Sequence, residues 1–159
     1  MSVRSFRIAT ENDLSLILDF IKGIAEYEKM LDQVVADENI LRKWIFEKKS
    51  AEVMFVLEDG VEVGFALFFH NFSTFLGRGG LYLEDIFVKP EFRGRGHGKA
   101  LIRELAKIAV ERGCGRFEWC CLDWNKPSID FYLSLGAVPM DEWTTYRLTG
   151  EKLTELANG

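Results

Sequence analysis

The chain has 159 residues and a mass of 18.3 kDa, which predicts one domain over residues 1–159 without an internal boundary. Its composition is 48% hydrophobic and 13% aromatic, which is enough to fill a folded interior and excludes disorder as the main state. The 20 basic residues against 25 acidic residues give a net charge of −5, which argues against a general nucleic-acid binder.

The sequence shows no sign of a membrane segment, a signal peptide or a metal site. Its longest apolar stretch, Val63 to Phe69, is far shorter than the roughly 20 residues that a membrane-spanning helix needs. The N-terminus lacks the apolar segment of a secretory signal, so we expect a cytoplasmic protein. The three cysteines, Cys114, Cys120 and Cys121, have neither disulfide-framework nor zinc-site spacing, which predicts reduced side chains and no metal.

The N-terminal third predicts one strand and two helices. Residues Val3 to Ile8 alternate as a strand does, and Thr10 is a suitable N-cap for a helix that ends near Lys29. A second helix is predicted after Asp37, ending near Lys48. Its apolar face is predicted to contain Ile40, Leu41, Trp44 and Ile45.

The middle of the chain predicts strands. Residues Ala51 to Glu58 and Val61 to Phe69 are β-rich and are separated by Asp59-Gly60, the dipeptide that a type I′ hairpin turn favours. A turn is predicted at residues 77–80, and a further strand at Leu81 to Val88, just before a proline.

The last part alternates helices and strands. Glycines at 94, 96 and 98 open a helix that ends at Gly113, and a strand is predicted from Phe117 to Leu122. Pro127 suits the start of a short helix reaching Gly136, and Thr144 to Leu148 is predicted as the final strand. The order indicates a mixed α/β fold of the α+β kind.

A basic, glycine-rich loop stands out in this acidic chain. The segment Lys89 to Arg103 has five basic residues and one acidic residue, a net of +4, so the remainder carries −9. Within it, residues Arg93 to Gly98 would expose backbone N–H groups at a helix N-terminus, where a pyrophosphate could bind. The spacing fits neither a Rossmann fingerprint nor a Walker A loop. The alternative is a solvated helix cap, but the basic cluster favours binding.

Residues 93–98, Arg-Gly-Arg-Gly-His-Gly, follow the strand 83–88 and resemble the acetyl-CoA pyrophosphate loop of the GNAT acetyltransferase superfamily. Four other segments are similar to its spermidine/spermine (diamine) N-acetyltransferase branch: 7–10, 25–28, 82–85 and 124–132. The resemblance implies one GNAT domain with a splayed, mostly antiparallel central sheet of six to seven strands flanked by about four helices. It also implies acetyl-CoA as cosubstrate and a homodimer.

The resemblance implies two catalytic residues. An amine substrate must lose a proton, which costs roughly 4.6 kcal/mol at pH 7, and Glu84 would accept that proton through water. Tyr132 would protonate the leaving CoA sulfur. Regular alternation would place Glu84 and Asp85 on opposite faces of their strand unless a bulge intervenes. The alternatives are a solvated strand carboxylate for Glu84 and an aromatic packing residue for Tyr132.

The implied cofactor contacts come from one strand, the loop and the short helix that begins near Pro127. The backbone around residues 86–88 would pair with the pantetheine arm, which the Asn125 side chain would also contact. The alternative for Asn125 is an ordinary N-cap, and one asparagine can fill both roles in different states. The implied cofactor-binding residues are Ile86, Phe87, Val88, Arg93, Gly94, Arg95, Gly96, His97, Gly98, Lys99, Asn125, Ser128 and Tyr132. His97 would contribute its backbone rather than its ring.

The implied substrate pocket is acidic and partly aromatic. It would consist of Tyr27, Glu28, Glu84 and Asp85, although the first two could also form an ordinary polar helix end. Residues 141–148 depart from the polyamine enzymes, so diamines, polyamines and lysine-like amino acids such as thialysine all remain open as substrates. The sequence thus predicts transfer of an acetyl group from acetyl-CoA to a small primary amine by direct attack in a ternary complex. A GNAT acting on a protein N-terminus or lysine, and a non-catalytic CoA-sensing domain, are the alternatives.

Overall fold

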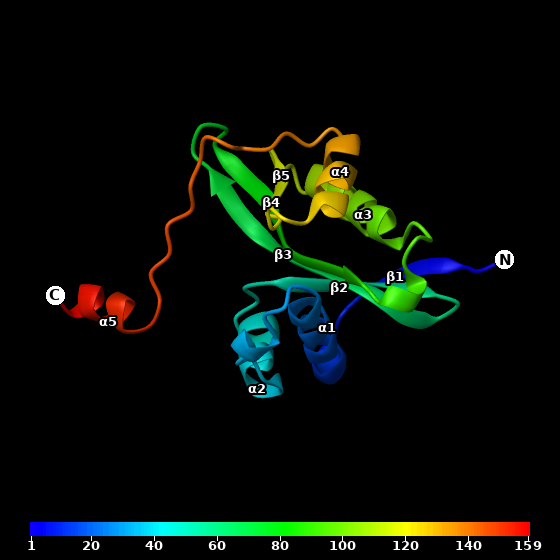
Figure 1. Cartoon of the computed structure of the whole chain (residues 1–159), viewed down its shortest axis with the longest axis horizontal. Coiled ribbons are helices and arrows are strands. Elements are labelled where there is room, and N and C mark those ends of the chain that lie inside the picture. Colours follow the sequence, from blue (N-terminus) through cyan, green and yellow to red (C-terminus); the bar gives the residue numbers. More distant parts are fainter. The chain divides into compact units, whose positions relative to one another are not determined.

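The structure is a computed structural model that describes all 159 residues (Figure 1). They form two compact units, an N-terminal unit (Met1–Cys120) and a C-terminal unit (Cys121–Gly159). The N-terminal unit contains the whole sheet, and each unit is described by itself below.

The N-terminal unit is built on a five-stranded sheet in the order β1-β2-β3-β4-β5. Its strands are β1 (Arg4–Ile8), β2 (Glu52–Glu58), β3 (Val61–Ser73), β4 (Arg78–Val88) and β5 (Phe117–Trp119). Strands β1 to β4 pair antiparallel, and β5 pairs parallel with β4. The predicted mixed α/β class is confirmed, but the sheet has five strands instead of six to seven.

Helices cover both faces of this sheet: α1 and α2 lie on one face and α3 on the other (Figure 1). The helical elements of the unit are η1 (Glu11–Asp13), α1 (Leu14–Tyr27), η2 (Leu31–Gln33), α2 (Glu38–Leu41), the π-helix η3 (Arg42–Glu47), η4 (Pro90–Phe92) and α3 (His97–Glu111). The shared core lies between α1, α2 and the sheet. Its buried members are Leu14, Ile17, Phe20, Leu41, Ile45, Val53, Phe55, Leu57 and Phe65.

The predicted helix starts are confirmed. Thr10 forms a capping box with Asp13 at the entry to α1, and the Asp37 carboxylate accepts a hydrogen bond of 2.8 Å from the Ile40 N–H. The predicted apolar face of the second helix is partly wrong, because Ile40 and Trp44 are exposed. The helix continues past Leu41 as a π-helix, whose wider turn changes which side chains reach the sheet.

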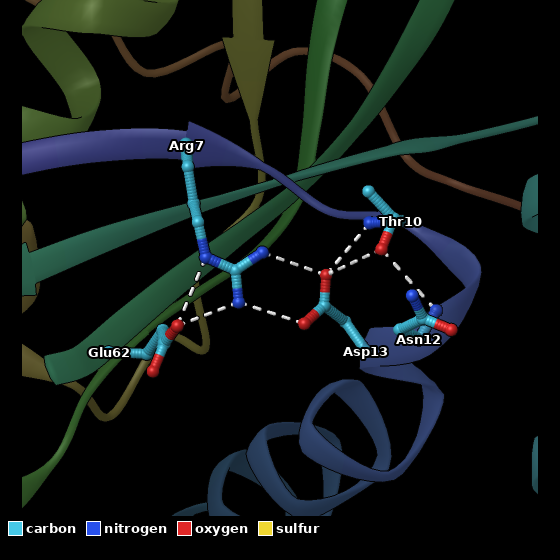
Figure 2. Close-up of polar contacts among 5 residues, drawn as sticks. All are labelled: Arg7, Thr10, Asn12, Asp13 and Glu62. Atoms are coloured by element: carbon cyan, nitrogen blue, oxygen red, sulfur yellow. Dashed lines mark hydrogen bonds and ion pairs between the residues drawn. The ribbon is translucent and has the colours of Figure 1, made fainter.

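A polar cluster around Arg7 joins the first strand to the first helix and to β3 (Figure 2). The Arg7 guanidinium donates two hydrogen bonds of 2.8 Å to the Asp13 carboxylate and also bonds Glu62 at 2.7 Å. The same guanidinium lies 4.8 Å from the centre of the Phe55 ring. A paired carboxylate favours its ionised form, so Arg7 lowers the pKa of Asp13 to about 2.

The two hairpins differ in how well the sequence predicts them. Asp59 and Gly60 both have positive φ, as a type I′ turn requires, so the first hairpin is confirmed. The second turn spans residues 74–77 instead of 77–80. Only Gly77 adopts a left-handed conformation, while Gly80 belongs to β4, where Asn71 and Arg116 leave no room for a side chain.

The C-terminal unit contains α4 (Lys126–Ser134) and α5 (Gly150–Asn158). Helix α4 has Pro127 in its first turn, and Gly136 follows it with a left-handed φ, as predicted. The predicted strand at 144–148 is wrong, since this segment is irregular and exposed, and the predicted strand at 117–122 ends at Trp119. Strand-like alternation forms a strand only where another strand pairs with it. Helix α5 was not predicted.

Candidate active site

The edge of β4 opens where β5 ends. Strand β5 pairs with β4 only at residues 81–83 of β4, and no strand continues the pairing along the same edge. The Lys89 N–H donates a hydrogen bond to the Val63 carbonyl and therefore points toward β3. Successive residues of a strand direct their N–H groups to alternate edges. The N–H groups of Val88 and Ile86 therefore point to the open edge. An extended ligand that carries amides could pair with them as an added strand.

A β-bulge interrupts β4 at Glu84. Leu67 of β3 faces Asp85, whereas the next residue, Phe68, faces Leu83, so Glu84 has no partner on β3. The bulge that the sequence suggested for this strand is thus present. Glu84 is exposed and Asp85 is half-buried. The two adjacent carboxylates lie at the level where the edge of β4 opens.

Asp85, a carboxylate of the predicted substrate pocket, is affected electrostatically by two others, Glu84 and Glu28. Burial, and after it the negative charges of Glu84 and Glu28, raise the pKa of Asp85 to about 6. Burial also raises the pKa of Glu28, which follows the last residue of α1. The structure thus brings together the end of α1 and the bulge of β4. A bound cation would relieve the repulsion among these groups.

A cleft of about 480 Å³ lies between α1 and the segment that follows β4. Its lining residues are Leu16, Asp19, Phe20, Gly23, Glu26, Tyr27, Phe87, Lys89, Pro90 and Arg93. Tyr27 is the predicted substrate residue that lines it, whereas Glu28, Glu84 and Asp85 lie outside the lining. The sequence reasoning missed Asp19 and Glu26. Their seven-residue spacing on a helix, which places both on one face, was the available signal.

Arg93, a predicted cofactor residue, is packed against this cleft. Its guanidinium carbon lies 5.2 Å from the ring centres of both Tyr27 and Phe87, and its Nε donates a 2.8 Å hydrogen bond to the Val88 carbonyl. A side chain at position 23 would come within 2.9 Å of the Phe87 ring, so Gly23 gives that ring its space. Arg93 therefore connects the open edge of β4 to the end of α1.

The glycine loop leads into α3 as predicted. Gly94 and Gly96 have φ angles of 77° and 85°, and Gly96 is the N-cap of the 15-residue helix. No atom lies within 4 Å of the point that a Cβ would occupy on Gly94 or Gly98. The loop therefore leaves open space beside the N–H groups at a helix N-terminus, which fits a phosphate group.

The charges of the loop are arranged differently from what the sequence suggested. Arg95 makes a 2.6 Å ion pair with Glu58, and His97 places its ring, 3% exposed, against the same carboxylate. Lys99 and Arg103 are exposed on α3 and make no ion pair. The net charge of +4 thus overstates the positive charge that the loop presents to a ligand.

The other predicted site residues belong to the C-terminal unit. Asn125 is buried and Tyr132 is half-buried; the Tyr132 ring centre lies 5.5 Å from that of Phe131. Asn125 is the N-cap residue of α4, as the alternative predicted, although its side chain makes no capping hydrogen bond. Its backbone carbonyl instead accepts from Ile129. Ser128 and Tyr132 lie four residues apart, on one face of α4.

One polar contact beside the site was not predicted. The Tyr82 hydroxyl lies 2.9 Å from the Cys120 sulfur, and burial together with this contact raises the pKa of Tyr82. All three cysteines are free thiols. The structure has no group of three or more His, Cys, Asp or Glu side chains placed to hold a metal ion. None of its helices combines the length and apolar character needed to cross a bilayer.

Comparison with known proteins agrees with this arrangement. The sequence matches the Acetyltransferase (GNAT) family over residues 19–137. It is 40% identical to thialysine N-epsilon-acetyltransferase of Sus scrofa, over 95% of each chain. It is 47% identical to L-ornithine N5-acetyltransferase NATA1 of Arabidopsis thaliana, over 61% of this chain and 42% of that protein.

The fold agrees as well. The solved structure of an integron cassette protein from the mobile metagenome of V. cholerae matches with a TM-score of 0.82 and 29% identity, covering 98% of both chains. The GNAT fold predicted from the sequence is therefore confirmed. The chain belongs to the GNAT acetyltransferase family and is an N-acetyltransferase.

Proposed function

We propose that this enzyme transfers an acetyl group from acetyl-CoA to the primary amine of a small molecule: a diamine, a polyamine or a lysine-like amino acid. The observation that carries the proposal is the open edge of β4 beside Asp85, a carboxylate that is repelled by the charges of Glu84 and Glu28. The edge suits an amide-bearing thioester, and the carboxylates suit an ammonium group. The substrates named for the two relatives, thialysine and L-ornithine, are both amino acids with a side-chain amine.

Acetyl-CoA would bind across the edge and the loop. The N–H groups of Ile86 and Val88 would pair with the pantetheine amides, and the N–H groups of residues 94–98 would surround the pyrophosphate. Lys99, exposed on the first turn of α3, adds a positive charge near the phosphates. Phe87, Asn125, Ser128 and Tyr132 complete the proposed cofactor site.

The amine would bind at the end of α1. Glu28 and Asp85 provide negative charge for the ammonium group, and Tyr27 provides an aromatic wall. The neighbouring cleft is lined by the acidic residues Asp19 and Glu26 and by the basic residues Lys89 and Arg93, so it offers partners to both charges of an amino acid.

In the proposed reaction, Glu84 accepts one ammonium proton through water, and the neutral nitrogen attacks the thioester carbonyl carbon. The carbon–nitrogen bond forms, the carbon–sulfur bond breaks, and the nitrogen passes its second proton to solvent water. Tyr132 donates a proton to the departing sulfur and is reprotonated from solvent. A backbone N–H at the open edge stabilises the oxygen that gains negative charge. Donation from an ordinary tyrosine to a thiolate is uphill by roughly 2 kcal/mol, so we propose that it accompanies cleavage of the carbon–sulfur bond.

The decisive experiment measures acetyl-CoA consumption with diamines, polyamines, lysine analogues and peptides. We expect turnover with small amines, and strongly reduced kcat in the Glu84→Gln and Tyr132→Phe variants. Turnover with peptides alone would favour a protein-acetylating enzyme, and CoA binding without any turnover would favour a sensor. If both variants keep the parent's rate, the assigned roles are wrong. Sedimentation of the whole chain would test the homodimer that we also propose, with one GNAT domain over residues 1–159 in each protomer.

A further inference from the structure

A partly buried polar network joins the glycine loop to the far end of β2. The Glu58 carboxylate accepts a 2.6 Å hydrogen bond from Arg95 Nη1 through one oxygen, and its other oxygen lies 3.1 Å from His97 Nε2. On the other side of the imidazole, Arg4 Nε lies 3.1 Å from His97 Nδ1. Arg4 Nη2 also donates a 2.6 Å hydrogen bond to the Arg95 carbonyl. We call these four residues the loop clamp.

The hydrogen-bond directions in the clamp define one tautomer of His97. Arg4 can only donate, so Nδ1 of His97 must accept. The ring proton is then on Nε2, which donates to the ionised Glu58. Each polar atom of the imidazole is satisfied in this neutral form, and the Glu58 charge is balanced by Arg95. The buried part of the clamp, Glu58 and His97, is therefore internally complete.

Burial raises the free energy needed to separate Glu58 from His97. Glu58 is 9% exposed and His97 is 3% exposed. A buried carboxylate or imidazole that loses its partner keeps the full cost of its desolvation. The clamp therefore restrains the Arg95 carbonyl and the His97 side chain, which lie on either side of the left-handed Gly96.

We propose that Glu58, His97 and Arg4 are positioning residues that hold the backbone of residues 95–97 in the conformation that receives the pyrophosphate of acetyl-CoA. This inference rests on the proposed function. It assigns recognition of the anion mainly to backbone N–H groups that are ordered before the cofactor binds, because the Arg95 charge is already neutralised by its ion pair with Glu58. Ordering the loop before binding removes an entropic cost that binding would otherwise carry.

The protein contains a matched control for this clamp. Glu52, at the start of β2, makes hydrogen bonds of 2.6 and 2.9 Å with Arg112, the C-cap of α3. The Glu52–Arg112 pair thus joins the same two elements as the clamp does, at the end of α3 that is remote from the glycine loop. Both of its side chains are 37% exposed.

The experiment compares two acetyl donors in the parent, His97→Leu, Glu58→Gln and Glu52→Gln. Acetyl-CoA contains the pyrophosphate, whereas S-acetyl-pantetheine has the same thioester and amides without it. We expect the clamp variants to raise the KM for acetyl-CoA by about tenfold or more with little change in kcat. Their kcat/KM for S-acetyl-pantetheine should stay within about twofold of the parent's, because general damage to the site would lower both. Glu52→Gln should match the parent with both donors.

His97→Gln keeps a donor for Glu58 and provides a milder variant if leucine prevents folding. Its KM for acetyl-CoA should lie between those of the parent and Glu58→Gln. Equal losses with both donors, or no loss with acetyl-CoA, would overturn the positioning role while leaving the proposed function intact. Calorimetry on the parent with CoA distinguishes failure of the positioning role from failure of the proposed function. Absence of CoA binding by the parent would overturn the proposed function itself.

Discussion

Asp13 and Asp85 are both aspartates of the N-terminal unit, yet their surroundings shift their acidities in opposite directions. Asp13 is held by the Arg7 guanidinium and the Thr10 N–H, and its pKa falls to about 2 (Figure 2). Asp85 is half-buried with Glu84 and Glu28 nearby, and its pKa rises to about 6. Asp13 has its counter-charge within the fold, whereas Asp85 has no cation beside it. We infer that the cation that Asp85 requires comes from the substrate.

The comparison predicts opposite effects on stability and activity at Asp85. Asp85→Asn should lower kcat/KM for the amine by about 100-fold, because a neutral amide cannot neutralise an ammonium group. The same variant should unfold with a free energy about 1–2 kcal/mol higher at pH 7.5, since a raised carboxylate pKa costs stability above that pKa. Enzyme kinetics and urea unfolding measure the two effects.

The stability gain should depend on pH. The cost of ionising Asp85 is complete above pH 6 and absent below about pH 3. The difference in unfolding free energy between Asp85→Asn and the parent should therefore shrink to about a quarter or less at pH 4 and disappear by about pH 3. A gain of equal size at pH 7.5 and pH 4 would contradict the assigned cause.

Activity should also reveal the titration of Asp85. As the pH falls through about 6, Asp85 becomes protonated, and kcat/KM for the amine should decrease by up to about tenfold for each pH unit. Deprotonation of the amine substrate also depends on pH, so the pH profile of the parent alone cannot identify the titrating group. The pH profile of Asp85→Asn should lack the inflection near pH 6. If the variant still shows that inflection, the titration belongs to another group.

Asp13 should behave in the opposite way. Asp13→Asn should lower the free energy of unfolding by about 2–3 kcal/mol at pH 7, because it removes the Arg7 ion pair and half of the capping box. A lowered carboxylate pKa provides stability that is complete above about pH 4 and is lost as the pH falls towards 2. Urea unfolding between pH 5 and pH 2 should show this loss in the parent and a flatter profile in the variant. Activity at pH 7.5 should stay near the parent's.

The smallest effect is expected at the second partner of Arg7. Glu62→Gln keeps a side-chain oxygen for Arg7 and leaves the Asp13 pair in place, so it should cost at most about 1 kcal/mol at pH 7. A loss as large as that of Asp13→Asn would mean that Arg7 depends on both carboxylates as one unit. A double variant measured beside the two single variants would show that coupling.

Local signals predicted most of the fold. The caps at Thr10 and Asp37, the Asp59-Gly60 turn and the glycine loop before α3 all depend on residues close together in the sequence, and the structure has each of them. The errors involve longer-range effects. The π-helix after Leu41 and the irregular segment 144–148 depend on what packs or pairs with them, which residue spacing does not state.

The candidate site shows the same division. The family motif indicated Glu84, Asp85 and the loop, because these residues are contiguous in the sequence. It did not indicate that Arg95 pairs with Glu58, since 37 residues separate them, or that Asp19 and Glu26 line a cleft with Arg93. Contacts of that kind arise only after the sheet brings distant segments together.

Because β5 is short, part of the β4 edge is unpaired, and this affects the tendency of the protein to aggregate. An unpaired strand edge can template hydrogen bonding with the edge of another chain, which is a common start of aggregation. In this protein the edge beyond Leu83 must stay open if it is to receive an extended ligand. The bulge at Glu84 and the charges of Glu84 and Asp85 make that edge irregular and unfavourable for a flat, apolar partner strand. The bulge and the two charges thus disfavour strand-to-strand aggregation along this edge.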